Sequence, residues 1–344
     1  MNQVPGTLMK ALFVAVMFLL APLAPVLAIE PVVQTITLEH DIDLITIINT
    51  APIITTRDGV RHTLRHDNKR FVLSTTSNRP PVAGQRPDDI LPDGEIAVGA
   101  GVIRRAWISA PTTRYDHGVL GDAIEGGAVS AELSDGRTVT LTLPSDSVFE
   151  DRMPRLIDMD KDGQDEILLV KTWLAHGAAP IVISLKNNNL EITAAARPIG
   201  LSHRWLNPVG AADFDGDGVN EIAAVVTPHI GGTLQLYKMT EDRLVKDLSA
   251  YGFSNHQMGS RNLGLSTIAD VNGDGIADII VPDASRNSLL AVSFGGGRFS
   301  QLFRLSLPGA ITSGLHTTDI DGDGRPEIIF AVDDRSLIVI SVRP

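Results

Sequence analysis

This 344-residue chain contains four acidic nonapeptides whose side chains could coordinate a cation. In the clearest copy, residues 213–221, carboxylates occupy positions one, three, five and nine, and glycine occupies position six. Alternating aspartates on a tight turn direct their side chains to one point, and Gly218 permits a reversal that a side chain would obstruct. Hard cations such as Ca²⁺ bind about six to eight oxygens at roughly 2.3–2.6 Å. The pattern predicts a cation site in which residue seven supplies a main-chain carbonyl and residue nine completes the coordination.

The nonapeptide recurs three more times in the same register, which argues against chance acidity in solvated turns. The third copy has asparagine at position three, so it offers one carboxylate fewer than the others and should bind the cation most weakly. The predicted ligands are Asp158, Asp160, Asp162, Gln164 and Glu166 in the first loop, Asp213, Asp215, Asp217, Val219 and Glu221 in the second, Asp270, Asn272, Asp274, Ile276 and Asp278 in the third, and Asp319, Asp321, Asp323, Arg325 and Glu327 in the fourth.

The EF-hand is the first alternative for such a loop, and the residues that follow each copy exclude it. An EF-hand needs a bidentate glutamate at position twelve and a helix on each side. Position twelve is apolar in every copy, and each loop leads into a short β-branched stretch such as residues 222–226 or 328–332. Such stretches are typical of buried strands. The loops are therefore expected to connect strand to strand.

The spacing of the loops predicts the architecture. Their first aspartates lie 55, 57 and 49 residues apart. A period of roughly 50 residues with several short strands in each repeat is typical of β-propellers, in which each repeat forms a four-stranded blade. The sequence predicts an all-β propeller of about six four-stranded blades, or seven if the early blades are short. The last repeat is one strand short, and residues 32–38 are expected to supply the closing strand.

The four loops, each Asp-x-(Asp/Asn)-x-Asp-Gly-x-x-(Glu/Asp) and each opening an apolar strand, resemble the FG-GAP (VCBS-type) repeats of integrin-α-like propellers. The resemblance covers residues 150–344, although the Phe-Gly and Gly-Ala-Pro signatures are poorly kept and residues 177–180 are their nearest trace. In that family the loop between the first two strands of a blade holds Ca²⁺. The resemblance thus implies up to four calcium sites, and it implies no integrin-like function.

Residues 1–28 have the features of a secretory signal peptide. A positive amino-terminal region precedes a long apolar stretch, and residues 26–28 offer small side chains for cleavage. Retention as a membrane anchor is the alternative, which Pro22 and Pro25 weaken. We expect an exported protein, periplasmic or secreted, with no membrane span after cleavage. Residues 29–344 then form a single propeller domain.

Composition restricts the partners. The chain has 41 acidic and 29 basic residues, for a net charge of −12, and no cysteine. An acidic chain without a basic stripe argues against nucleic acid as a partner. In an exported protein without disulfides, we expect the metal loops to stabilise the fold instead. Residues 122–127 occupy the place of a cation loop in an earlier repeat, but they lack the alternating carboxylates.

A second candidate site is predicted on the face opposite the cation loops, around one end of the central channel. A tryptophan beside arginine and histidine suits a sugar ring, or an anionic or aromatic group. Trp205 and His229 should then line one concave pocket with their polar atoms turned toward it. Packing between blades is the alternative reading, and a catalytic or transition-metal site built from the histidines is another. The candidate ligand-binding residues are His117, His176, His203, Arg204, Trp205, His229, His256 and Arg261.

Two classes of function remain open. The first is a non-catalytic binding or adhesion module with structural Ca²⁺, a monomer whose partner is an unidentified protein or carbohydrate. The second is a calcium-stabilised propeller enzyme that acts on a polysaccharide or an ester in the cell envelope. The sequence has no Gly-x-Ser-x-Gly, His-Glu-x-x-His or phosphate-loop motif, which favours the first class. A deep central pocket with histidine and acidic groups in hydrogen-bond reach would favour the second.

Overall fold

The computed structural model describes residues 29–79 and 84–343. Within these ranges the regular structure is β-strand, apart from one short 3-10 turn at Gly295–Gly297. The expected signal peptide, residues 1–28, lies outside the described residues. No helix in the described part of the chain is long and apolar enough to cross a membrane.

The strands form six antiparallel groups of four, with one additional strand, β10 (Ser147–Phe149), between the second and third groups. The three groups from β6 to β18 are joined with β10 into one 13-stranded sheet, and the other three are separate sheets. The groups are β2 (Ile42–Ile48), β3 (Ala51–Thr56), β4 (Arg61–Asp67) and β5 (Arg70–Thr75); β6 (Ala97–Val98), β7 (Ile103–Thr112), β8 (Glu125–Leu133) and β9 (Thr138–Thr142); β11 (Arg155–Ile157), β12 (Glu166–Trp173), β13 (Gly177–Lys186) and β14 (Asn189–Ala196); β15 (Leu206–Ala212), β16 (Glu221–Val226), β17 (Thr233–Thr240) and β18 (Arg243–Tyr251); β19 (Thr267–Ala269), β20 (Asp278–Pro282), β21 (Ser288–Ser293) and β22 (Ser300–Ser306); and β23 (His316–Thr318), β24 (Glu327–Val332), β25 (Ser336–Arg343) and β1 (Glu30–Thr37).

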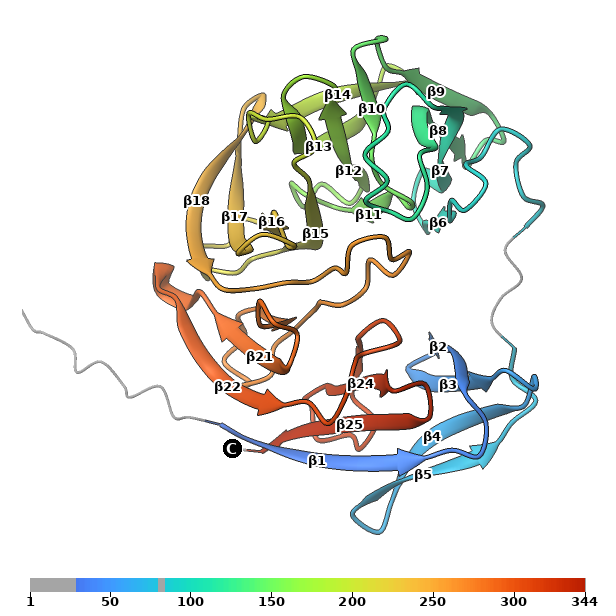
Figure 1. Ribbon diagram of the computed structural model, residues 1–344, viewed down its shortest axis with the longest axis vertical. Coiled ribbons are helices and arrows are strands. Elements are labelled where there is room, and N and C mark those ends of the chain that lie inside the picture. Colours follow the sequence, from blue (N-terminus) through green and yellow to red (C-terminus); the bar gives the residue numbers. More distant parts are fainter. Residues whose placement is uncertain (1–28, 80–83, 344) are drawn as a thin grey trace, which may run out of the picture.

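The first strand of the chain completes the last group. β1 pairs antiparallel with β25, from Glu30 opposite Arg343 to Thr37 opposite Ser336. Figure 1 shows the two strands side by side. The expectation that an N-terminal strand pairs with the last repeat is confirmed by this register.

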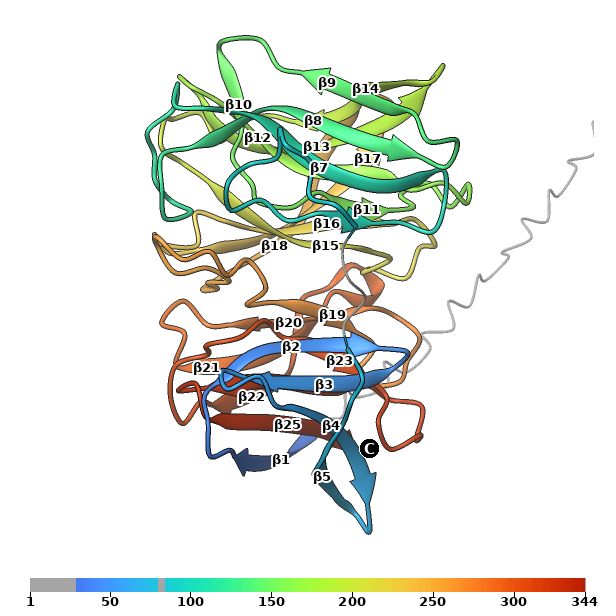
Figure 2. The ribbon, with the colours of Figure 1, turned by 90° about the vertical axis from the view of Figure 1, so that its right-hand side faces the viewer.

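Residue pattern determines where each strand lies within its group. β16 reads Glu-Ile-Ala-Ala-Val-Val and is buried along almost its whole length, as expected for a strand covered on both faces. β18 mixes polar and apolar residues, and only Leu244 and Ala250 of the strand are buried. Five apolar clusters fill the spaces between consecutive groups, from β6–β9 through to β2–β5. In Figure 1 the groups accordingly lie around a common centre, and in Figure 2 they stack in two halves, with β6–β18 in one and β19–β25 and β1–β5 in the other.

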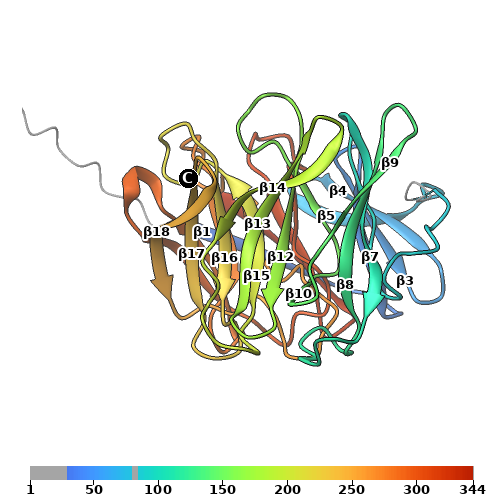
Figure 3. The same ribbon diagram turned by 90° about the horizontal axis from the view of Figure 1, so that it is seen from above.

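Antiparallel connections divide the loops between two faces of the molecule. Figure 3 shows β12, β13, β15, β16 and β17 standing side by side between two rims. All four cation loops join the first strand of a group to the second, so they share one rim. In the β6–β9 group the equivalent connection is residues 99–102, which approach Asp165 of the first cation loop. Residues 122–127 instead end the second-to-third connection and begin β8, so their assignment as the place of a lost cation loop is wrong.

Candidate metal centres

The ninth residue of each cation loop is a buried carboxylate at the start of a strand. Glu166, Glu221, Asp278 and Glu327 are 8, 0, 0 and 2 % exposed. In each loop one oxygen of this carboxylate accepts a hydrogen bond from the main-chain N–H of residue two, at 2.8 to 3.1 Å. The other oxygen of Glu221 and of Asp278 has no hydrogen-bond partner among the described residues. A buried carboxylate oxygen without a donor is what a bound cation would satisfy.

The main chain of each loop holds the first aspartate in place. Asp213 accepts hydrogen bonds from the N–H groups of Gly216 and Gly218, both at 2.8 Å. Gly218 has φ +92°, a left-handed conformation that glycine adopts without steric cost. The glycine at position six makes the same bond to Asp158, Asp270 and Asp319, at 2.9, 2.8 and 3.0 Å. The four loops therefore share one hydrogen-bonded framework.

The carboxylates converge in three of the four loops. One ligand oxygen from each of positions one, three and nine lies within 4.8 Å of the others in the first, second and fourth loops. The third loop differs because Asn272 replaces the carboxylate at position three, and its side-chain amide donates to Asp274 Oδ2 at 2.9 Å. The residues at position seven, Gln164, Val219, Ile276 and Arg325, each donate their N–H to the carboxylate at position five, at 2.8 to 2.9 Å. Their carbonyls remain predicted ligands.

Burial and charge repulsion raise the pKa of the four ninth-position carboxyls. Burial, the larger cause, and the neighbouring loop carboxylates together raise the pKa of Glu166, Glu221, Asp278 and Glu327 to about 7, against the lowering effect of the main-chain donor. The donor set consists of oxygens only, which suits a hard divalent cation such as Ca²⁺ rather than a metal that prefers nitrogen or sulfur. The residues of the loops thus fit calcium.

Lys238 gives the second loop an internal cation. It lies on β17 opposite Glu221 of β16 in the strand register. Its Nζ forms an ion pair with Asp217 and lies 3.7 Å from Glu221 Oε1 and 3.8 Å from Asp215 Oδ2. The ammonium group therefore lies among the carboxylates to which a metal ion would bind.

We expect Lys238→Met to tighten calcium binding at the second loop by about tenfold, because the bound ion no longer competes with an ammonium charge. Calorimetric titration of the metal-free protein measures this directly. Lys246→Met is the matched control, since Lys246 is exposed on the neighbouring strand β18. Weaker calcium binding in Lys238→Met would show that the lysine organises the carboxylates rather than competing for them.

The third loop should gain affinity from one added carboxylate. Asn272→Asp restores the charge count of the other loops, so we expect the weakest calcium site to bind severalfold more tightly. Lys238→Met and Asn272→Asp should strengthen calcium binding at different loops, the second and the third. Titration of each single variant and of the double variant should therefore show two separate gains in affinity. If Asn272→Asp leaves every affinity unchanged, charge number does not rank the loops.

The opposite rim brings five of the predicted ligand-binding residues together in two aromatic groups. His203 stacks on Tyr115 and meets His117 edge-on, with ring centroids 5.1 Å apart in both pairs. Trp205 stacks on His229 at 6.2 Å and meets His256 edge-on at 4.8 Å. These residues come from four different connections, so the expected convergence in space is observed for them.

Glu150 joins the two groups and was not anticipated from the sequence. Its carboxylate is fully buried, with Oε1 2.5 Å from His117 Nδ1, while Oε2 accepts a hydrogen bond from Thr172 at 2.7 Å. Its main-chain carbonyl accepts a hydrogen bond from Trp205 Nε1 at 2.9 Å. The Trp205 indole is only 2 % exposed. The expectation that its polar atom faces an open pocket is therefore wrong, because that atom is satisfied inside the protein.

The two histidines beside Trp205 form a directed neutral pair. His256 Nε2 lies 2.9 Å from the carbonyl of Ser260, which can only accept, so this nitrogen carries a proton. His256 Nδ1 then accepts from His229 Nε2 at 2.9 Å. Burial is the main cause that lowers the pKa of both rings to about 4. The pair ties the connection after β16 to the connection after β18.

The other three candidate residues are not members of the two aromatic groups. Arg204 donates to the carbonyl of His203 at 3.1 Å, and His176 is exposed in the turn after β12. Arg261 pairs with Asp93 and Asp122 and borders a central cavity of about 400 Å³. The predicted ligand-binding residues thus do not form one pocket.

One arrangement on this rim bears on the enzymatic alternative. Ser202 Oγ lies 3.0 Å from His203 Nδ1, and His203 Nε2 lies 3.2 Å from Asp116 Oδ1. The Ser202 hydroxyl, however, donates its proton to the carbonyl of Leu174 at 2.8 Å. With its proton on the Leu174 carbonyl, the Ser202 hydroxyl does not donate to His203 Nδ1, so the ring does not act as a base toward the hydroxyl in this geometry.

The functional residues that the sequence did not indicate are Lys238 and Glu150. Neither belongs to a motif, and each acts on residues at least 17 positions away in the chain, as the pairing of Lys238 with Glu221 and of Glu150 with His117 shows. The alternation of strand β17 would have identified Lys238 once the register with β16 was known.

Comparison with known proteins supports the repeat assignment. Residues 270–330, which contain the third and fourth loops, match the family model of the FG-GAP-like repeat. The resemblance to FG-GAP repeats that was inferred from the loops is confirmed over these residues. No curated protein matches the chain.

Proposed function

We propose that this protein is an exported, calcium-stabilised β-propeller of six blades, closed by the pairing of β1 with β25, that acts as a non-catalytic binding module. The single observation that carries the calcium assignment is the buried ninth carboxylate, which repeats four times with one oxygen held by the main chain. The six groups of four strands around a common centre support the blade count. The FG-GAP-like repeat at residues 270–330 is the kind of module that such propellers contain.

A binding role is favoured over the enzymatic alternative by the state of the polar groups on the rim opposite the loops. The buried Glu150 carboxylate already binds His117 and Thr172, and the indole N–H of Trp205 is already bonded. Such groups hold connections together rather than await a substrate. A polysaccharide or an ester as substrate would need an activated nucleophile or an acid pair, and the Ser202 hydroxyl is directed away from His203.

Calcium titration of metal-free protein tests the proposal. We expect up to four sites by calorimetry, with one site lost in the double variant Asp213→Asn, Glu221→Gln. Replacing Glu241, an exposed turn residue between β17 and β18, by Gln should remove none. Failure to bind calcium at millimolar concentration would refute the metal assignment. Export predicts that protein recovered from expressing cells begins at Ile29.

A further inference from the structure

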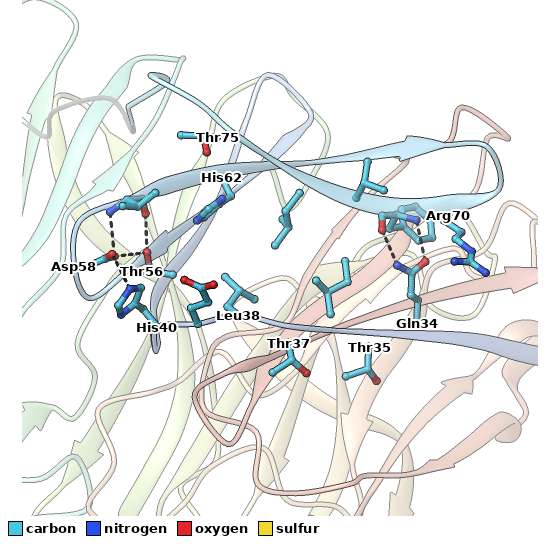
Figure 4. A pocket seen from close by; sticks show the side chains of 16 residues that line it. Gln34, Thr35, Thr37, Leu38, His40, Thr56, Asp58, His62, Arg70 and Thr75 are labelled. Atoms are coloured by element: carbon cyan, nitrogen blue, oxygen red, sulfur yellow. Dashed lines mark hydrogen bonds and ion pairs between the residues drawn. The ribbon is translucent and has the colours of Figure 1, made fainter.

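A groove of about 850 Å³ lies between β1 and the β4–β5 hairpin, as Figure 4 shows. Its floor is formed by β1 and the residues after it, including the half-buried side chains of Ile36 and Leu38. Its wall is β5. Val60 and Val72, which also line it, are both 38 % exposed, so apolar surface is open to solvent here.

The edge of β5 that faces the groove has no partner strand among the described residues, since β5 ends the order β2-β3-β4-β5. The direction of its main-chain groups follows from two bonds. The N–H of Thr76 donates to the carbonyl of Arg61 in β4, so it points away from the groove. The N–H and C=O of Phe71 instead point into the groove, where they bond to Gln34. In an antiparallel ladder these directions alternate along the strand. Leu73 and Thr75 therefore present their N–H and C=O at the same free edge as Phe71.

Gln34 shows what this edge binds. Its side-chain amide donates to the carbonyl of Phe71 at 2.6 Å and accepts from the Phe71 N–H at 2.9 Å (Figure 4). One primary amide thus makes both hydrogen bonds that a peptide unit of a neighbouring strand would make. It occupies the edge only at Phe71, so the next two outward-facing residues remain available.

Charge along the groove sets a direction. Asp58 lines it near the Thr75 end of β5, where its carboxylate lies 3.4 Å from His40, and Arg70 lines it at the other end. Glu39, which also lines the groove, directly precedes His40 in the chain. An antiparallel strand paired with β5 has its amino-terminal end beside the two acids and its carboxyl-terminal end beside the arginine. The charges of the groove are complementary to a segment that begins with a basic residue and ends with an acidic one.

We propose that this groove binds an extended polypeptide segment, which adds to the free edge of β5 as an antiparallel strand and lies over Ile36 and Leu38. Main-chain hydrogen bonds to Leu73 and Thr75 supply part of the affinity, and alternate apolar side chains contact the floor. The inference rests on the proposed role as a binding module and gives it a class of partner, a protein rather than a carbohydrate.

The probe is a dye-labelled hexapeptide, Lys-Val-Thr-Val-Thr-Glu, measured by fluorescence anisotropy on the calcium-loaded full chain. We expect a Kd on the order of 10–100 µM, as befits a short strand with few anchors. The peptide with Lys and Glu exchanged should bind about tenfold more weakly. N-methylation of alternate residues should abolish binding in one alternation and spare it in the other, because only one set of N–H groups faces β5.

The matching protein variant is Glu39→Lys with Arg70→Glu, which should reverse the preference between the two peptides. Glu191→Lys with Arg243→Glu, a pair of exposed substitutions on β14 and β18, is the charge-matched control and should leave the preference intact. Hydrogen exchange should show slower exchange of the β5 amides when the peptide is bound. No binding at 1 mM peptide, or binding indifferent to charge order and to N-methylation, overturns the proposal.

Two further outcomes separate the possible failures. If sedimentation shows a dimer that the charge reversal dissociates, the groove holds a second copy of this chain and the proposal is wrong. If the protein binds calcium as proposed but binds no peptide, only the groove inference fails. If the protein binds no calcium, the proposed function is refuted, whatever the peptide does.

Discussion

Removal of calcium should lower the melting temperature of this protein by about 20 °C. Each site that binds only the folded chain adds about 2.7 kcal/mol at a calcium concentration of 100 Kd, so four sites add roughly 10 kcal/mol. In a chain of this size each kcal/mol shifts the melting temperature by about 2 °C. Differential scanning calorimetry of protein dialysed against a chelator, and again after calcium is restored, measures the effect.

The effect of calcium should depend on pH with a definite sign. The pKa of the ninth-position carboxyls is about 7 in the metal-free folded protein, above the ordinary values of 4.5 for glutamate and 3.8 for aspartate. The folded state therefore holds more protons than the unfolded state between roughly pH 4 and pH 7. This contribution to stability is complete below the ordinary pKa and is lost as pH rises through about 7. Metal-free protein should melt higher at pH 5.5 than at pH 7.5.

Calcium reverses that dependence, because its binding replaces the protons on the four carboxyls. The gap between the metal-free and calcium-loaded melting temperatures should be wider at pH 7.5 than at pH 5.5. Magnesium at equal concentration is the control cation, since it demands a smaller octahedral site and should restore less of the stability. If melting is the same with and without chelator after exhaustive stripping at pH 7.5, the loops do not bind a structural metal.

The cation loops could be predicted from the sequence because their predicted ligands lie close together in the chain. Asp213 and Glu221 lie within one nonapeptide, and the cage closes through main-chain bonds such as Gly218 N–H to Asp213. Its last ligand also begins the next strand, so one motif determines both the loop and the strand boundary. The recurrence of the loops gives the length of the repeat. The last repeat is one strand short, which indicates that β1 pairs with its final strand, β25.

Contacts between repeats could not be predicted in the same way. Lys238 reaches the second loop because the turn between β16 and β17 sets a register that pairs it with Glu221, and that turn contains Thr227 at φ +50°. Strand β4 shows little pattern in the sequence, because its residues Arg-His-Thr-Leu-Arg-His-Asp are largely polar and carry little apolar alternation. Glu150 shows no pattern at all, since its partners come from other connections and from strand β12.

Trp205→Ala should destabilise the calcium-loaded protein by about 3–5 kcal/mol, the usual cost of truncating a large buried aromatic residue. The indole is 2 % exposed and packs in the apolar cluster between the β11–β14 and β15–β18 groups. Truncation also removes the donor to the carbonyl of Glu150, which costs about 1 kcal/mol more. If Trp205 lined an open ligand pocket, as the sequence predicted, Trp205→Ala would change ligand binding and leave the melting temperature nearly unchanged.

Two substitutions separate packing from hydrogen bonding at this position. Trp205→Phe keeps an aromatic ring beside His229 and His256 but loses the indole N–H, so it should cost about 1–2 kcal/mol. Trp173→Ala is the matched control, because Trp173 is only half-buried at the end of β12 and its loss should cost less than that of Trp205. Chemical denaturation in saturating calcium gives all three values, and calorimetry should find the calcium sites unchanged, since the loops lie on the other rim. If the Trp205→Ala protein unfolds at the same denaturant concentration as the wild type, the indole is not part of the packed interior. That result would favour the open pocket lined by Trp205 that the sequence predicted.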